Sequence, residues 1–202
     1  MVCSTVNGLD SLRTRIAAVL EAFDYDVIMS DRHTVRVDPR KSNLDNCLAA
    51  VEQADLILGI VTGRYGEPVD EFCRFEPLKG LSVTHREIRH AIAANKPRWF
   101  LVHYNVVVAD SILRQFRKFD ADRLTIDFGY KGVDRLDNIR ILDLYDEIRL
   151  TGAWARECPV GNWAQDFKSD DEAIKYVEKN FEDYLRRRRK LMLQLHHQIG
   201  TG

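Results

Sequence analysis

The most constraining feature of the chain is a short apolar run at residues 55–61, DLILGIV. It is hydrophobic on both faces, contains β-branched residues, and stands between a helical pattern and a Thr-Gly turn. A strand with these properties is typical of the centre of a parallel sheet that helices cover on both sides. The run therefore indicates an α/β fold.

Hydrophobic periodicity alternates between helical and strand patterns along the N-terminal half. After a very short first strand, helices are predicted at residues 9–23, 42–54 and 82–96, and strands at residues 25–30, 55–61 and 98–108. This βαβαβαβ order predicts a doubly wound parallel sheet with right-handed crossovers. Ligands of such sheets bind outside the carboxyl ends of the strands, where the strand order reverses.

The pattern is weaker after residue 108. We predict a short basic helix at 110–119 and a polar loop at 120–138, while residues 140–150 fit a segment that begins as a strand and finishes as a helix, and their structure stays open. Residues 170–197 carry apolar side chains at three- and four-residue intervals, which predicts a long terminal helix. We therefore expect an α/β domain at residues 1–150 and an extension at 151–202, whose long helix packs on the domain or on a partner subunit.

Composition argues against several functional classes. Thirty Lys and Arg residues against 31 Asp and Glu residues give a formal net charge of −1, so no overall field attracts nucleic acid or an anionic membrane. The basic run at 186–190 follows an acidic first half of the same helix, as the helix dipole favours, so nucleic acid is not expected as a partner. No segment has the roughly twenty apolar residues of a membrane span. The four cysteines lack zinc spacing, which indicates reduced thiols in a cytoplasmic protein without a metal site.

Two interpretations of Glu87 are open, because the predicted helix begins SVTHRE. If the helix starts at Thr84, residues 84–87 form a capping box in which Glu87 returns to the backbone of its own helix. If it starts at Ser82, a spacing of about 100° per residue places Glu87 in the apolar arc, with His85 and Arg86 outside it. An inward carboxylate is paired, accepts hydrogen bonds, or opens onto a cleft with a raised pKa. We favour the start at Ser82, with Glu87 facing the crevice.

A long loop at residues 62–81 leaves the central strand just before this helix, and loops of that length are usually functional or disordered. Arg64, like Arg86, can meet a phosphate or be merely solvated. Tyr65 can stack on a base or a nicotinamide ring, or plug a turn. Asp55 can line the site or cap the turn before its strand. Ser82 and Thr84 can contact a ligand or cap the helix.

Four sequence elements occur together in the first 108 residues. They are Asp55 opening an apolar strand, the turn Gly63-Arg64-Tyr65-Gly66, the helix start Ser82/Thr84/Glu87, and the pair Lys96-Pro97 before the next strand. Together they resemble a family of uncharacterised bacterial domains found in large signalling NTPases and defence proteins. That family is similar to Toll/interleukin-1-receptor-like (TIR-like) NAD hydrolases and to nucleoside 2-deoxyribosyltransferases.

The resemblance implies a flavodoxin-like sheet and chemistry at an N-glycosidic bond. Glu87 matches the glutamate of the related groups, so it would act as nucleophile or stabilise an oxocarbenium-like ribosyl centre. The family's Ser-Ser-Thr turn is reduced here to Ser4-Thr5. Besides Glu87, the candidate substrate-binding residues are Ser4, Asp55, Arg64, Tyr65, Ser82 and Thr84.

NAD would be a substrate of this chain and not a cofactor. The residues before Glu87 lack the aspartate and Gly-Thr pair of the deoxyribosyltransferases, which favours an NAD hydrolase or cyclase in antiviral defence or signalling. A homo-oligomer or a larger defence complex is the expected assembly. The alternative is a non-catalytic, nucleotide-sensing or self-assembling module, since related sheets serve both purposes.

Overall fold

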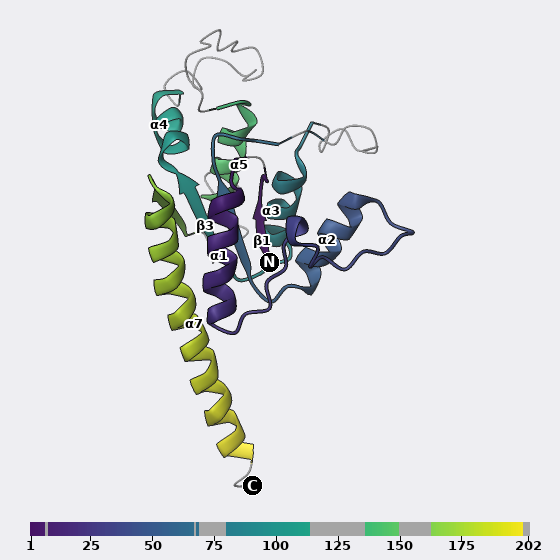
Figure 1. Ribbon diagram of the computed structural model, residues 1–202, viewed down its shortest axis with the longest axis vertical. Coiled ribbons are helices and arrows are strands. Elements are labelled where there is room, and N and C mark those ends of the chain that lie inside the picture. The colour runs from purple at the N-terminus through teal and green to yellow at the C-terminus, as the bar shows by residue number, and fades with distance from the viewer. Residues whose placement is uncertain (7, 67, 69–79, 114–135, 150–162, 200–202) are drawn as a thin grey trace. The chain divides into compact units, whose positions relative to one another are not determined.

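The computed structural model describes residues 1–6, 8–66, 68, 80–113, 136–149 and 163–199, without the side chains of 188, 189 and 191–199 (Figure 1). It consists of two compact units, Met1–Gly8 with Ile28–Lys168 and Leu9–Val27 with Ser169–Gly202. The first unit contains the sheet, and the second contains a pair of helices.

The sheet has four parallel strands in the order β1-β2-β3-β4. They are β1 (Val2–Ser4), β2 (Ile57–Val61), β3 (Arg98–His103) and β4 (Ala164–Phe167). The helices of the same unit are α2 (Asn43–Gln53), α3 (Val83–Ala93), α4 (Tyr104–Leu113) and α5 (Arg140–Ile148), with a short 3-10 turn at Ser30–Arg32. The α/β, doubly wound parallel architecture predicted from the sequence is confirmed.

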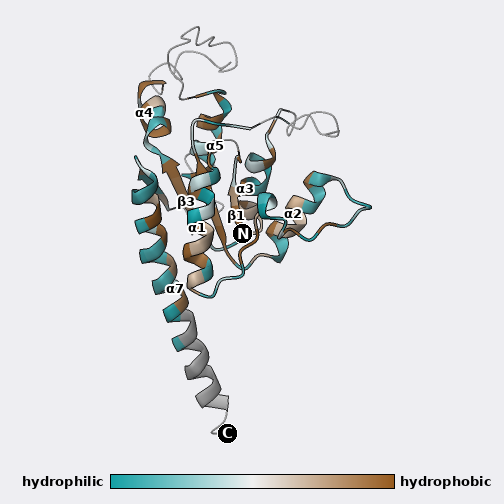
Figure 2. Cartoon of the chain, in the orientation of Figure 1, coloured by the Kyte–Doolittle hydropathy of each residue, from teal (hydrophilic) through white to brown (hydrophobic). Residues whose placement is uncertain are grey.

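The core of the sheet unit lies between the strands and the helices α2, α3 and α5. Cys3, Ile57 and Phe100 from three strands join Val51 of α2 and Ile88 of α3 in one buried cluster. The strand residues of opposite parity, which are Val2, Leu58, Ile60 and Leu101, are buried as well. Figure 2 accordingly shows β3 as largely hydrophobic.

Gly59 sets the packing in the middle of β2. A Cβ atom at this position would lie 2.5 Å from a Phe100 ring carbon and 3.5 Å from the Ile88 side chain. The absence of a side chain therefore allows the Phe100 ring to cover the strand beneath α3.

The second unit pairs α1 (Asp10–Ala22) with α7 (Asp170–Ile199), so the predicted long terminal helix is confirmed. Arg15 Nη2 lies 2.6 Å from Asp171 Oδ1, and the Tyr25 hydroxyl donates to the Phe181 carbonyl over 2.8 Å. The Tyr25 and Phe181 rings meet edge to face with centroids 5.7 Å apart. One apolar stripe of α7 is thus occupied by α1.

Two predicted strands differ from the structure. Residues 25–30 are not a regular strand, although the Val2 N–H donates to the Ile28 carbonyl over 3.0 Å. With three residues, β1 offers too short an edge for a longer ladder. The strand predicted at 98–108 ends at His103, and Tyr104 begins α4, because a wholly apolar run does not distinguish a helix from a strand.

Two further elements were not predicted from the sequence, or their type was left open. Residues 140–148 form a helix, α5, and the short strand β4 was not predicted. Because β4 pairs with β3, the sheet continues beyond the domain boundary expected at residue 150. Most of the basic helix predicted at 110–119 and of the loop predicted at 120–138 lies outside the described residues. Among the helices that the structure describes, none has the length and apolar character needed to cross a membrane.

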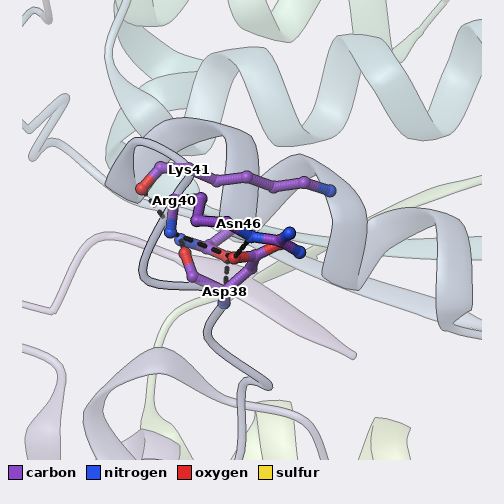
Figure 3. Close-up of polar contacts among 4 residues, drawn as sticks. All are labelled: Asp38, Arg40, Lys41 and Asn46. Carbon is purple, nitrogen blue, oxygen red and sulfur yellow. Dashed lines mark hydrogen bonds and ion pairs between the residues drawn. The ribbon is translucent and has the colours of Figure 1, made fainter.

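The start of α2 is held in place by a buried asparagine, Asn46 (Figure 3). Its side-chain oxygen accepts from the Asp38 N–H over 2.8 Å, and its amide nitrogen donates to the carbonyls of Asp38, Lys41 and Ser42. Ser42 caps the helix by accepting from the Asp45 N–H over 3.1 Å. These bonds fix the first turn of α2, which carries Cys47 at its end.

Candidate functional site

The carboxyl ends of β1 and β2 flank the point where the strand order reverses. From β1 the chain reaches Ile28, which is bonded to one side of β1, and then returns to form β2 on the other side. Ligands of doubly wound sheets bind at such a switch point. The sequence prediction placed the candidate site at the same edge.

Ser82 is the N-cap of α3. Its hydroxyl oxygen accepts from the backbone N–H of His85 over 3.3 Å, and the helix begins at Val83. The helix start favoured from the sequence is therefore confirmed. Thr84 lies inside the first turn, so the alternative capping box of Thr84 and Glu87 does not form.

Glu87 lies one turn into α3 and is 5% exposed. Its carboxylate interacts with two thiols, Cys3 of β1 and Cys47 of α2, and both thiols form side-chain hydrogen bonds with it. Cys3 is buried and Cys47 is half-buried, and both are free thiols, as predicted. The inward direction predicted for Glu87 is confirmed by this burial and by these partners.

The two thiols remain protonated near neutral pH. Burial, reinforced by the nearby Glu87 carboxylate, raises the pKa of Cys3 well above its usual value. The same causes raise the pKa of Cys47 to about 11. Each thiol therefore retains the proton with which it can donate a hydrogen bond to Glu87, although thiols are weak donors.

A second polar network lies on another side of α3. The Tyr65 hydroxyl is 2.7 Å from His85 Nδ1, and His85 Nε2 is 3.2 Å from Glu147 Oε2. Arg89 donates from Nε to Glu147 Oε2 over 2.8 Å and from Nη2 to Glu147 Oε1 over 2.5 Å. The network connects the turn after β2, the first turns of α3, and α5.

The Glu147 carboxylate can only accept, so the His85 tautomer that fits it carries its proton on Nε2. In that tautomer Nδ1 accepts from the Tyr65 hydroxyl, while the backbone N–H of Ser82 donates to the Tyr65 oxygen. Burial raises the pKa of Tyr65 to about 12. Burial also acts to raise the pKa of Glu147, but hydrogen bonds from His85 and Arg89 outweigh it and lower this pKa overall.

His85 and Arg86 correct the helical-wheel prediction. Both were placed outside the apolar arc of α3, yet His85 is fully buried and Arg86 is 6% exposed. The reason for His85 is that α5 packs against α3 and presents Glu147 to it. A wheel describes a single buried face and does not show a second helix on another side.

Asp137 stabilises the turn after β2 through two hydrogen bonds, and the sequence did not indicate this role. Its carboxylate accepts from the Tyr65 N–H over 2.8 Å, and its own N–H donates to the Gly63 carbonyl over 2.9 Å. No local motif distinguishes Asp137 from its polar neighbours.

The structure gathers four of the predicted substrate-binding residues at the carboxyl edge. Ser4 ends β1, Tyr65 follows β2, and Ser82 and Thr84 begin α3. All four are buried, and the Tyr65 hydroxyl is engaged by His85. The Tyr65 ring therefore packs in the interior and is not exposed for stacking on a ligand.

The other two predicted substrate-binding residues are placed differently. Asp55 precedes β2 and is exposed, so it lies at the amino edge of the sheet, opposite the switch point. Its inclusion in the site is corrected, because parallel strands send all their amino ends to one edge. Arg64 is exposed in the turn after β2, where its N–H donates to Thr62 Oγ1 over 3.3 Å. Within the described parts of the chain, no group of His, Cys, Asp and Glu side chains could hold a metal ion.

A comparison with known families identifies the N-terminal part of the chain. The model of a family described as a domain of unknown function, DUF4062, matches residues 1–129. The chain belongs to this family. The matched segment contains β1, β2, α3 and Glu87, but not Asp137 or Glu147. No curated protein matches the chain.

Proposed function

We propose that this DUF4062 protein cleaves or transfers at the N-glycosidic bond of NAD or a related nucleotide, as TIR-like NAD hydrolases do. The observation that carries the proposal is the position of Glu87. Its carboxylate is buried behind the first turn of α3, on the side that faces β1 and α2 and beside the switch point. It is therefore placed near the edge where doubly wound sheets bind their ligands.

The chemistry requires a carboxylate next to the anomeric carbon. As the bond to the base breaks, positive charge develops on the ribosyl C1′, and a negative group stabilises it or forms a covalent ester. Nicotinamide leaves NAD as a neutral molecule, so its departure needs no general acid. The nearby thiols of Cys3 and Cys47 keep their protons and do not compete as nucleophiles.

The half-buried Cys47 indicates the direction of approach to Glu87. Cys47 contacts Glu87 from α2 and is itself partly exposed, so solvent comes near the carboxylate on this side. A ribose that entered between the first turns of α2 and α3 would meet the carboxylate there.

The test compares Glu87→Gln with a matched surface control, Glu52→Gln. Glu52 is 57% exposed on α2 and bonds to His90 over 2.6 Å, so its replacement removes one charge without touching the site. Each protein is incubated with NAD and with a panel of nucleosides, and released base and ribosyl products are quantified by mass spectrometry. We expect Glu87→Gln to lower product release at least about 100-fold, as does the loss of a group that stabilises transition-state charge. Glu52→Gln should match the wild type.

Absence of products from the wild-type protein, or full activity of Glu87→Gln, would remove the catalytic proposal. A second candidate, a non-catalytic nucleotide sensor, is favoured by the 5% exposure of Glu87. For a sensor, Glu87→Gln would retain ligand binding, measured by calorimetry, and no product would form with either protein. The version of this candidate in which Glu87 caps its own helix is excluded, because Ser82 is the cap.

A further inference from the structure

Thr5 carries a buried hydroxyl that none of the described residues satisfies. The residue is 9% exposed, and its Oγ1 atom has no hydrogen-bond partner in the described part of the chain. Burying a hydroxyl without a partner is unfavourable, and such groups in native structures call for an explanation. A ligand that accepts its hydrogen bond is one such explanation.

Thr5 lies against the start of α3. A Cβ atom built on Gly66 would be 3.2 Å from the Thr5 methyl group and 3.6 Å from the Cβ of Ser82. Thr5, the Gly66 turn and the N-cap Ser82 therefore meet at the carboxyl edge of β1 and β2. Gly66 has a φ of +82°, a conformation that side chains other than glycine rarely adopt, so this close approach is built into the turn.

A backbone donor is present at the same place. The first N–H groups of a helix have no partner within the helix, and the hydroxyl of Ser82 accepts from one of them, that of His85. The N–H group of Thr84, in the first turn, has no partner within the helix and can donate to a ligand. It also lies at the positive end of the helix dipole, which favours an anion.

The spacing to Glu87 matches a nucleotide. Alternate residues of an extended chain point to the same side, so Thr5 continues the side of β1 on which Cys3 meets Glu87. Two residues of strand span about 7 Å. The first turn of α3 covers a similar distance, since four residues from Val83 to Glu87 rise about 6 Å. A ribose at Glu87 would thus extend its 5′-phosphate to Thr5 and the helix start.

We propose that Thr5 Oγ1 and the backbone N–H group of Thr84 bind the 5′-phosphate of a nucleotide whose ribose lies at Glu87. The inference rests on the proposed function and deepens it, because it restricts the substrates to phosphorylated nucleosides. It assigns to Thr5 a binding role, with the hydroxyl donating to a phosphate oxygen. In the ligand-free protein this hydroxyl has no acceptor among the described residues, so it lowers the stability of the fold while it stays positioned to bind the phosphate.

The experiment measures binding in a Glu87→Gln background, so that turnover does not consume the probe. Adenosine 5′-monophosphate, adenosine and inorganic phosphate are titrated by calorimetry into this protein and into the same protein with Thr5→Val or Thr5→Ser. Valine keeps the shape of threonine without the hydroxyl, and serine keeps the hydroxyl without the methyl group. We expect Thr5→Val to weaken the monophosphate about tenfold, the effect of one lost hydrogen bond to a charged group, and to leave adenosine within about twofold. Thr5→Ser should retain the monophosphate affinity.

The thermal stability of the ligand-free protein separates a binding role from a structural one. Thr5→Val removes an unsatisfied buried hydroxyl, so we expect the Tm to rise by about 2 °C or more. A Tm that falls, together with unchanged monophosphate affinity, would show that the hydroxyl is a structural group and overturn the inference. Lack of monophosphate binding to the Glu87→Gln protein would overturn it as well, and so would inorganic phosphate binding as tightly as the nucleotide, because the site would then hold free phosphate.

These results are independent of catalysis. Thr5-dependent binding without any product from the Glu87 experiment would leave the phosphate site standing and refute the catalytic proposal. Product formation with Thr5→Val binding unchanged would do the reverse.

Discussion

Replacing Glu147 by glutamine tests the energetic role of the buried network beside the candidate site. The side chains of His85, Glu147 and Arg89 are 0%, 11% and 30% exposed. One carboxylate oxygen accepts from His85 and from Arg89 Nε, and the other accepts from Arg89 Nη2. Glutamine has the same shape but only one acceptor oxygen. Its NH2 group must therefore replace one of the two acceptors and face an N–H donor of His85 or Arg89.

The size of the effect follows from this exposure. Removing one partner of a fully buried ion pair costs about 3–5 kcal/mol. Because Arg89 retains some contact with water, we expect the lower end, about 3 kcal/mol. For a chain of 202 residues, that loss corresponds to a fall in Tm of about 6–12 °C.

The pH dependence gives a second, independent signature. The pKa of Glu147 is lowered from 4.5, so the unfolded chain takes up this proton at a higher pH than the folded protein does. The stabilisation is therefore complete above about pH 4.5 and is lost as the pH falls through the lower folded value. The difference between wild type and Glu147→Gln should be full at pH 7 and should shrink under acid conditions.

Thermal unfolding is followed by circular dichroism at pH 7 and at several values below pH 4.5, with Glu52→Gln as the control. Glu52 is 57% exposed, so its ion pair with His90 should contribute about 1 kcal/mol or less. In a double-mutant cycle, Arg89→Gln added to Glu147→Gln should cost less than the two single losses together, because the two side chains share one interaction. If Glu147→Gln is no less stable than the control, the network does not stabilise the fold and the reasoning is refuted.

The remaining predictions concern Glu87 and the start of α3. Glu87→Gln should lower the pKa of Cys47 from about 11, while burial keeps this pKa above 9.0. Alkylation of Cys47 near pH 9.5, measured by peptide mapping, should therefore become faster. An unchanged rate would argue against a charged Glu87 beside this thiol. Ser82→Ala should destabilise the protein by about 1 kcal/mol through loss of the cap, and Ser82→Gly by a few tenths, as measured by urea denaturation; equal losses for Ser82→Ala and Ser82→Gly would contradict the capping assignment.

The local parts of the fold were predictable from the sequence. Apolar spacing correctly predicted α1, α2, α3 and α7, and the doubly apolar run at residues 55–61 correctly predicted β2. These elements are long, or are bounded by caps such as Ser42 and Ser82, so neighbouring residues suffice to define them. Short or ambiguous elements were not predictable, because β4 has four residues and an apolar run such as 98–108 fits two structures.

The candidate site shows the same division. The sequence predicted that Glu87 points inward, because that follows from the helix start and a regular turn angle. It did not predict that Cys3 and Cys47 would meet this carboxylate, or that His85 would be buried against Glu147, 62 residues away. Those contacts depend on which strands pair and which helices pack together.

The sequence by itself therefore determined the α/β class, the helices α1, α2, α3 and α7, the central strand β2, and the inward direction of Glu87. Tertiary structure decided which side chains surround Glu87, that the Tyr65 ring packs in the interior, and that Asp55 lies at the opposite edge of the sheet. The physical reason is that periodicity is set by neighbours along the chain. The partners of a buried polar group are set by packing between segments that the chain brings together only when it folds.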